Sequence, residues 1–317
     1  MTRPRVDVYS PEYKELLAKD SEAHRIRTDE NLENNVTWVY DPIECNWPYA
    51  WLYEAILGAE FARWDGILRS RHGGRARIID LGCGPGGSSL WFAARGYDVI
   101  GIDACKERVE VANRLAERRK DYIAKAGGRL RFVACDFFEY EPEEHEAVIT
   151  VKTLHHVPDT EALIRRFARN MTPNGTFFVL DQMGDPSFSN CAFRVGRALY
   201  PPGFCKTSWY HRQRAAVGAV LRFLHLMKPE VSFAETIDDP LEEIGQELTI
   251  PAFQKLFKKI VMHEIDPLRV LFVGSDLKDT LCKRWILSPL LALNALFRLT
   301  NLSFERGIVS HLEDMVP

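Results

Sequence analysis

The segment RIIDLGCGPGGSSL, residues 77–90, has the residue types and spacing of a nucleotide-binding loop. From Gly82 to Gly87 it matches G-x-G-x-x-G, the fingerprint of dinucleotide-binding proteins. From Asp80 to Gly86 it also fits a second nucleoside-binding pattern, D-x-G-x-G-x-G. Glycines let the backbone approach a ligand closely, and the helix that follows offers unpaired N–H groups. The spacing alone leaves both ligands open.

The charge around this loop distinguishes the two patterns. A dinucleotide brings a dianionic pyrophosphate, whereas S-adenosylmethionine (SAM), the ligand of the second pattern, brings an ammonium, a carboxylate and a cationic sulfonium. Asp80 would repel the pyrophosphate but attract the ammonium. Pro85 removes one N–H group that a phosphate would use. Both residues favour SAM, and an NAD(P)-dependent oxidoreductase stays as the alternative.

Two further acids end predicted strands. Asp103 ends DVIGID, where a carboxylate can accept both ribose hydroxyls of either cofactor. Asp136 ends LRFVACD beside Phe137, a pair that suits the exocyclic amine and the ring face of an adenine. Ligands of open α/β sheets bind at the carboxyl ends of the strands. Three acids at three successive strand ends therefore indicate one site.

The elements that must position these residues alternate between strands and helices, which is typical of a parallel sheet covered on both faces. The expected fold class is α/β, a Rossmann-like doubly wound sheet, mostly parallel with a C-terminal antiparallel strand. The predicted strands are 77–81, 98–103, 130–136, 146–152 and 176–181. The predicted helices are 88–96, 106–127 and 160–171, the last with Asp159 as its N-cap and the turn TPNG after it.

The flanking segments are predicted to cover this core. Residues 1–45 are polar and mixed in charge, and the turn-forming residues of 31–48 are typical of an irregular cover segment. Residues 47–69 read as an amphipathic helix. Residues 259–265 and 268–276 are separated by Asp266-Pro267, which predicts an antiparallel hairpin at the sheet edge. The expected division is a helical N-terminal cover (1–74), a SAM-binding core (75–183), a lid or acceptor-binding insertion (184–247), completion of the sheet (248–275), and a C-terminal apolar helix and tail (276–317).

Composition limits the function classes. The chain has 317 residues, 46% hydrophobic and 27% charged, with a net charge of -3, so a soluble globular protein without a nucleic-acid partner is expected. Its seven cysteines have no metal-binding or disulfide spacing, and no secretory signal is present, so a cytoplasmic location is predicted. The apolar segment 285–299 is too short to cross a bilayer. It is expected to pack on the core, to form a homodimer or to touch a membrane surface.

The motifs IIDLGCGPGG, VIGIDACKERVEVA, VACDFF and VKTLHHVPD together resemble class I SAM-dependent methyltransferases of the small-molecule type. The resemblance implies SAM as the cofactor, S-adenosylhomocysteine (SAH) as the product, and no required metal. Carried over to this chain, it implies a cofactor site made of Asp80, Gly82, Gly84, Gly86, Asp103, Ala104, Asp136, Phe137, Val151 and Lys152.

A hydroxyl acceptor must lose a proton during methyl transfer, so a base near the methyl group is expected. His155 and His156, just after the fourth strand, are the best placed candidates, and His211 in the insertion is another. Histidines that only pack the loop are the alternative. The motifs of nucleic-acid and protein arginine methyltransferases are absent, which leaves a small organic acceptor, most readily at oxygen. A lipid-like acceptor at a membrane and a non-catalytic SAM-binding protein stay open.

Overall fold

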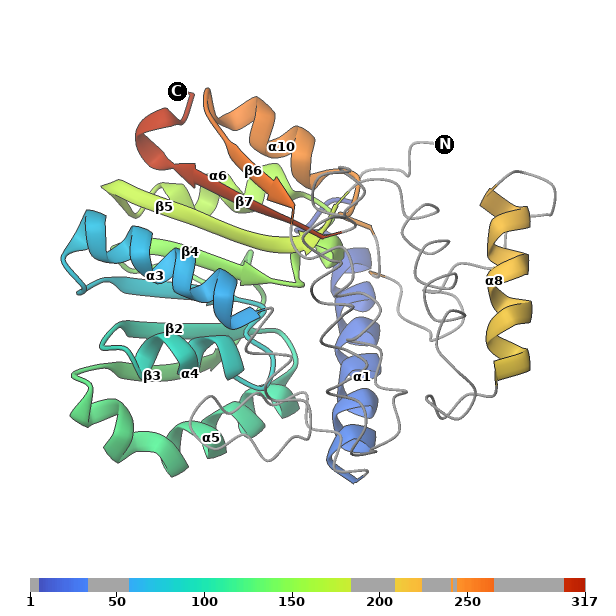
Figure 1. Ribbon diagram of the computed structural model, residues 1–317, viewed down its shortest axis with the longest axis horizontal. Helices are drawn as coiled ribbons and strands as arrows, with labels where there is room; N and C mark the ends of the chain where they lie inside the picture. Colours follow the sequence, from blue (N-terminus) through green and yellow to red (C-terminus); the bar gives the residue numbers. More distant parts are fainter. Residues whose placement is uncertain are drawn as a thin grey trace.

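A seven-stranded sheet lies at the centre of the computed structural model, which describes residues 6–33, 57–183, 209–223, 241, 244–264 and 305–316. The strand order is β3-β2-β1-β4-β5-β7-β6 (Figure 1). β1 to β5 pair in parallel, and β7 is antiparallel to both of its neighbours. The bounds are β1 Arg77–Leu81, β2 Asp98–Asp103, β3 Arg129–Ala134, β4 His145–Val151, β5 Met171–Gln182, β6 Val261–Glu264 and β7 Glu305–His311. The expected Rossmann-like class is confirmed.

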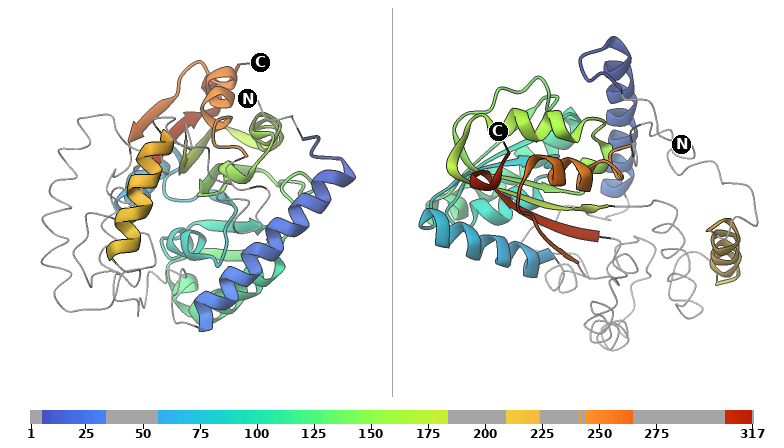
Figure 2. Two further views of the ribbon diagram at one scale, coloured as in Figure 1. Left: turned by 90° about the vertical axis from the view of Figure 1, so that its right-hand side faces the viewer. Right: turned by 90° about the horizontal axis from the view of Figure 1, so that it is seen from above.

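The sheet is buried on both faces because its strands are apolar at successive positions. Ile78 and Ile79 are both fully buried, and they belong to two different core clusters. One cluster includes side chains of α3, α4 and α5, and the other includes side chains of α6 and α10. Figure 2 shows helices on the two sides of the sheet. Their bounds are α3 Ala59–His72, α4 Gly87–Ala93, α5 Lys106–Lys125, α6 Thr160–Ala168 and α10 Thr249–Leu256.

Local signals explain several of the helix ends. Asp159 caps α6, since its carboxylate accepts a hydrogen bond from Ala162 N at 2.9 Å, as its position before the helix predicts. α3 ends at Gly73, whose φ of 65° is the left-handed conformation that favours glycine. The predicted helix 47–69 therefore runs three residues too short, and its first part lies outside the described residues.

The N-terminal segment forms a helix that the sequence analysis did not predict. α1, Pro11–Glu33, stands across the carboxyl ends of the parallel strands (Figure 1). Its apolar contacts come from its first turns, where Tyr13, Leu16 and Leu17 join one of the core clusters. The rest of α1 is polar, without the apolar periodicity that would have marked a helix. The irregular segment predicted at 31–48 is therefore wrong for 31–33, and the rest of it lies outside the described residues.

The far edge of the sheet includes a strand, β7, that the sequence did not predict. β6 pairs with β7, which comes from the C-terminal end of the described chain, and β7 also pairs with β5. Among the described residues β6 pairs with 305–311, and the predicted pairing of 259–265 with 268–276 stays a prediction. The structure does not describe 268–276. The antiparallel strand was expected at this edge, but it belongs to the segment that we had assigned to the tail.

The predicted turn TPNG, residues 172–175, lies inside β5 instead. The pairing of β4 with β5 shifts here, because His145 faces Met171 while Ala147 already faces Thr176. The four residues are accommodated as an irregularity of the strand, so β5 begins at Met171 and contains the predicted strand 176–181.

Much of the predicted lid lies outside the described residues. Within 184–247 the structure describes α8, Trp209–Phe223, together with residues 241 and 244–247. The C-terminal helix predicted at 285–299 lies outside the described residues altogether. Where the structure describes the chain, no helix combines the length and the apolar character that crossing a bilayer requires.

Candidate functional site

The glycine-rich loop joins β1 to α4 next to the point where the strand order reverses, between β1 and β4. Gly82 and Gly86 have φ angles of 70° and 91°, which side chains rarely adopt. A Cβ at Gly82 would meet the Thr153 side chain at 2.1 Å. At Gly84, by contrast, a Cβ would meet nothing within 4 Å. The loop therefore packs tightly against the protein at Gly82 and leaves open space at Gly84.

We expect Gly86→Ala to destabilise the protein. The positive φ alone should cost about 1–2 kcal/mol, and a Cβ would also lie 2.6 Å from the Phe132 ring. Thermal unfolding should show a midpoint several degrees below that of the wild type. The matched control is Gly66→Ala, inside α3, where a Cβ meets nothing within 4 Å and alanine should be neutral or stabilising. Equal midpoints for the two variants would contradict the role assigned to Gly86.

Asp80, at the end of β1, is fully buried under the loop. Ser88 and Ser89 each donate a hydrogen bond to its Oδ2 at 2.6 Å, whereas its Oδ1 has no hydrogen-bond partner among the described residues. Burial raises the pKa of Asp80 to about 6, and the two serine hydrogen bonds oppose that rise. A buried carboxylate oxygen without a partner is costly unless a donor binds it. Asp80 thus fits an ammonium group such as the one SAM carries.

Asp103, at the end of β2, is held by the loop backbone. Its Oδ2 accepts a hydrogen bond from Gly84 N, and its Oδ1 accepts one from Cys105 N, both at 2.9 Å. Each carboxylate oxygen has a second lone pair, so these bonds leave acceptor capacity for ribose hydroxyls. The structure places Asp103 as a support of the glycine loop, and its predicted contact with ribose stays a prediction.

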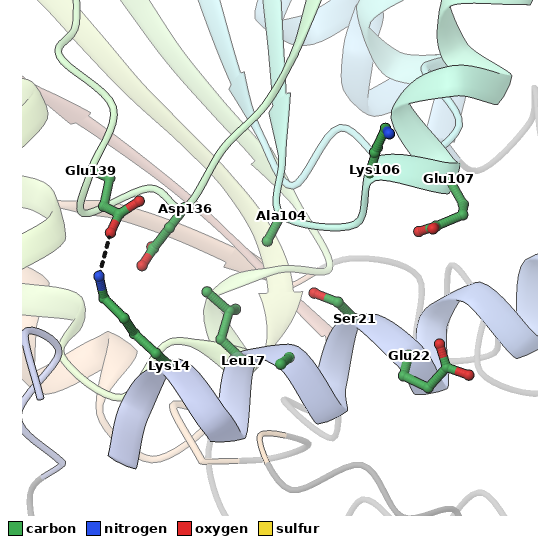
Figure 3. A pocket seen from close by; sticks show the side chains of 10 residues that line it. Lys14, Leu17, Ser21, Glu22, Ala104, Lys106, Glu107, Asp136 and Glu139 are labelled. Atoms are coloured by element: carbon green, nitrogen blue, oxygen red, sulfur yellow. Dashed lines mark ion pairs between the residues drawn. The ribbon is translucent and has the colours of Figure 1, made fainter. Parts of the chain in front are cut away.

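A cavity of about 530 Å³ lies between α1 and the ends of β2 and β3 (Figure 3). Two of the predicted cofactor residues, Ala104 and Asp136, line it, and α1 contributes residues such as Leu17 and Ser21. Its volume lies within the range of small-molecule sites, roughly 300–1,000 Å³. Phe137 lies beside this wall but is half-buried and packs against the core. The glycine loop is not among the residues that line this cavity, so the cavity covers one part of the predicted site.

α1 is fastened to this edge by polar contacts. The Tyr13 hydroxyl donates a hydrogen bond to Asp136 Oδ1 at 3.4 Å, and Phe138 N donates to the same oxygen at 3.0 Å. Burial is the main reason why the pKa of Asp136 is raised. Lys14 pairs with Glu139 at 2.9 Å on the exposed rim (Figure 3). No sequence motif marks α1, so its place as one wall of the site could not be predicted.

The loop after β4 is organised by Asp181, a fully buried residue at the end of β5. Thr153 N and Gln182 N donate hydrogen bonds to its carboxylate at 3.0 and 2.7 Å. Lys152 enters the loop with a φ of 59°, uncommon for a side chain other than glycine. Val151 and Lys152 thus mark a bend toward the glycine loop, and their predicted contacts with the cofactor stay predictions.

His155 and Asp181 form a buried pair. His155 Nδ1 lies 2.6 Å from Asp181 Oδ1, and His155 N donates to Asp181 Oδ2 at 3.3 Å. Burial pushes the pKa of Asp181 upward, but the attraction of His155 and Lys152 and the hydrogen bonds outweigh it, so that the pKa lies below its ordinary value. The ionised carboxylate selects the tautomer with a proton on Nδ1, which leaves Nε2 of the neutral ring as the basic nitrogen.

The other two candidate bases lie elsewhere. His156 turns toward α1, where its Nδ1 lies 3.1 Å from Asp20 Oδ1. His211 lies in α8, and the placement of its side chain is outside the description. The structure therefore pairs one of the three histidines, His155, with a buried carboxylate of the sheet. The signal that could have identified Asp181 was its position at a strand end, shared with Asp80, Asp103 and Asp136.

The comparison with known families agrees with this arrangement. Residues 79–179 match a family described as "Methyltransferase domain", and this range runs from β1 to β5. The chain carries a class I SAM-dependent methyltransferase domain. SAM is the cofactor of this domain, and the dinucleotide alternative for the glycine loop is set aside. The residues present fit SAM, because within the described part of the chain Asp80 Oδ1 lacks a partner and Gly84 faces open space.

Curated relatives match the methyltransferase domain in sequence. The chain is 34% identical over 105 residues to the ubiquinone biosynthesis O-methyltransferase of Aliivibrio fischeri (strain ATCC 700601 / ES114), which covers 32% of this chain and 42% of that protein. It is 36% identical over 104 residues to the protein of the same name from Xanthomonas campestris pv. campestris (strain B100), covering 33% and 42%. The chain therefore spans less than half the length of these relatives.

Solved structures also resemble the chain. The plantazolicin methyltransferase BpumL in complex with SAH has a TM-score of 0.44 at 13% identity, covering 95% of this chain and 97% of that one. The DhpI-SAH complex has a TM-score of 0.36 at 21% identity, covering 53% and 70%.

Proposed function

We propose that the protein is an enzyme that transfers a methyl group from SAM to a hydroxyl oxygen of a small organic acceptor. The observation that carries this proposal is the buried pair of His155 and Asp181 on the loop after β4. Such a pair is the usual way to hold a neutral histidine in one tautomer as a general base. The names of the sequence relatives, which are O-methyltransferases, also support oxygen as the methylated atom.

In this proposal SAM supplies a methyl group on a cationic sulfur. Asp80 Oδ1 would accept a hydrogen bond from the ammonium of SAM, and Asp103 would accept hydrogen bonds from the ribose hydroxyls. Asp136 would bind the adenine beneath α1. These residues come from three neighbouring strand ends, so they hold the cofactor at one edge of the sheet. Burial under α1 would exclude water from this edge.

The acceptor hydroxyl loses its proton to His155 Nε2. As the ring gains that proton it becomes a cation, and the ionised Asp181 beside Nδ1 stabilises it. Asp181 itself is fixed by backbone N–H groups of Thr153, His155 and Gln182, so little reorganisation accompanies the proton transfer. A base in this position contributes about 10²–10⁴-fold to such a reaction.

The proposal is tested by incubating the full chain with SAM and a panel of phenols, catechols and hydroxy acids, with and without a prenyl chain. We expect formation of SAH together with a product whose new methyl group is on oxygen, identified by mass spectrometry and NMR. A product methylated on carbon or nitrogen would contradict the choice of oxygen. Binding of SAH without turnover of any acceptor would favour the non-catalytic reading, and turnover of prenylated acceptors alone would favour the lipid-like one.

A further inference from the structure

Three side chains that meet beneath α1 form a second cluster, outside the pair of His155 and Asp181. Asp20 and His24 lie one helical turn apart on α1, so they share one face of the helix. His156 reaches the same point from the loop after β4. One ligand atom from each of the three residues lies within 4.8 Å of the others. The cluster thus joins an N-terminal helix to the catalytic edge of the core.

The three groups are already close to the geometry of a metal site. His156 Nδ1 lies 3.1 Å from Asp20 Oδ1, and His24 Nε2 lies 3.6 Å from Asp20 Oδ2. Around a tetrahedral zinc ion, with metal–ligand bonds of about 2.0–2.2 Å, neighbouring ligand atoms are about 3.3 Å apart. The two histidine rings meet edge to face with centroids 5.0 Å apart, so neither ring blocks the other. A small rotation of these side chains would bring all three atoms to one ion.

The donor set selects the kind of ion. Two imidazole nitrogens and one carboxylate oxygen suit zinc and similar divalent transition metals, whereas magnesium and calcium prefer oxygen ligands. The side chains of Asp20, His24 and His156 are 8%, 12% and 14% exposed, so the ion would be shielded from solvent. Among the described residues three ligands are at hand, and a tetrahedral ion would take its fourth ligand from water or from another group.

We propose that Asp20, His24 and His156 form a binding site for a divalent transition metal such as Zn²⁺, which clamps α1 onto the loop after β4. The residue after Asp20 in the chain, Ser21, lines the cofactor cavity, as do Lys14 and Leu17 from the same helix. The metal therefore favours the state in which α1 closes that cavity. By linkage, metal and SAH raise each other's affinity.

The test uses the full chain, freed of metal with a chelator, and titrates Zn²⁺ by calorimetry and Co²⁺ by visible absorption. We expect one Zn²⁺ per chain, a Co²⁺ spectrum of nitrogen and oxygen ligands, and no comparable binding of Mg²⁺. His24→Gln, His156→Gln and Asp20→Asn should each weaken Zn²⁺ binding by about 100-fold or more. The matched control is His72→Gln, at the far end of α3 near the start of β1, which should bind like the wild type.

Several results would overturn the proposal. One is the absence of stoichiometric Zn²⁺ binding to the wild type, and another is Zn²⁺ binding that survives in the three variants. A third is a Co²⁺ spectrum with thiolate charge transfer, which would place the ion on cysteines. Circular dichroism and cooperative unfolding verify that the variants fold. Independently of them, an anomalous difference map from crystals grown with Zn²⁺ should place a peak between the three residues, and a peak elsewhere would contradict the site. None of these measurements depends on methyl transfer by the enzyme. A failure of the metal site can therefore be distinguished from a failure of the proposed methyl transfer.

Discussion

Replacing His155 with glutamine is expected to lower kcat for methyl transfer to a hydroxyl by about 10²–10⁴-fold. Glutamine keeps a polar side chain of similar length, and its amide hydrogens can still donate to Asp181, but it cannot accept a proton at neutral pH. The Michaelis constant for SAM and the affinity for SAH should change little, because His155 is assigned to the acceptor. Steady-state kinetics with the acceptor found in the panel, together with calorimetry of SAH, separate the two effects.

A structural role for His155 would give a different pattern. Loss of SAH affinity and of thermal stability in parallel with activity would mean that the histidine only packs the loop. Asp181→Asn is a second variant. The asparagine can hold His155 in the tautomer whose proton is on Nε2, which cannot act as the base, so kcat should also fall. His72→Gln, far from this edge, serves as the control and should keep its activity. An unchanged kcat in His155→Gln would remove the histidine from the mechanism.

Replacing Asp80 with asparagine is expected to weaken SAM binding by about 10- to 100-fold at neutral pH, the effect of a lost hydrogen bond to a charged group. The unpartnered Oδ1 is the atom assigned to the ammonium. Because burial raises the pKa of Asp80 to about 6, the carboxylate must lose a proton to bind a cation. The Kd of the wild type should therefore rise as the pH falls below about 6, by up to tenfold per unit.

The raised pKa of Asp80 also makes the free energy of unfolding depend on pH. The pKa of Asp80 in the folded state lies above its value in the unfolded chain, so the unfolded chain releases this proton first and the group lowers stability as the pH rises from about 4 to 6. SAM binding should offset that loss. Calorimetric titrations of SAM between about pH 5 and 7 test the account. A Kd of the wild type that is flat over this range, or that varies equally in Asp80→Asn, would contradict the role of Asp80.

The core of the fold was predictable because its signals are local. β1 and β2 occupy the predicted ranges, since each is a mostly apolar run with an aspartate at or next to its carboxyl end. The glycine loop was predictable for the same reason, because its residue spacing reflects backbone geometry at Gly82 and Gly86. Asp80 and Asp136 could be named in advance as strand ends, though their buried environments could not.

The parts that were not predictable depend on contacts between distant segments. The sequence favoured 268–276, which lies outside the described residues, as a partner of β6, and only the pairing in space reveals 305–311 between β5 and β6. α1 is a mostly polar helix: only its first turns pack on the apolar core, and Tyr13 and Asp20 make polar contacts with Asp136 and His156, so no apolar periodicity marked it. Asp181 ends the predicted strand 176–181, but no motif linked it to His155, because the two meet only when the loop after β4 folds back onto β5.

The most direct test of the central claim is a crystal structure of the chain with SAH bound. The account predicts that the amino group of SAH lies within hydrogen-bond distance of Asp80 Oδ1, its ribose at Asp103, and its adenine in the cavity between Asp136 and α1. SAH bound elsewhere, or an amino group that makes no contact with Asp80, would contradict the assignment of this edge of the sheet as the cofactor site.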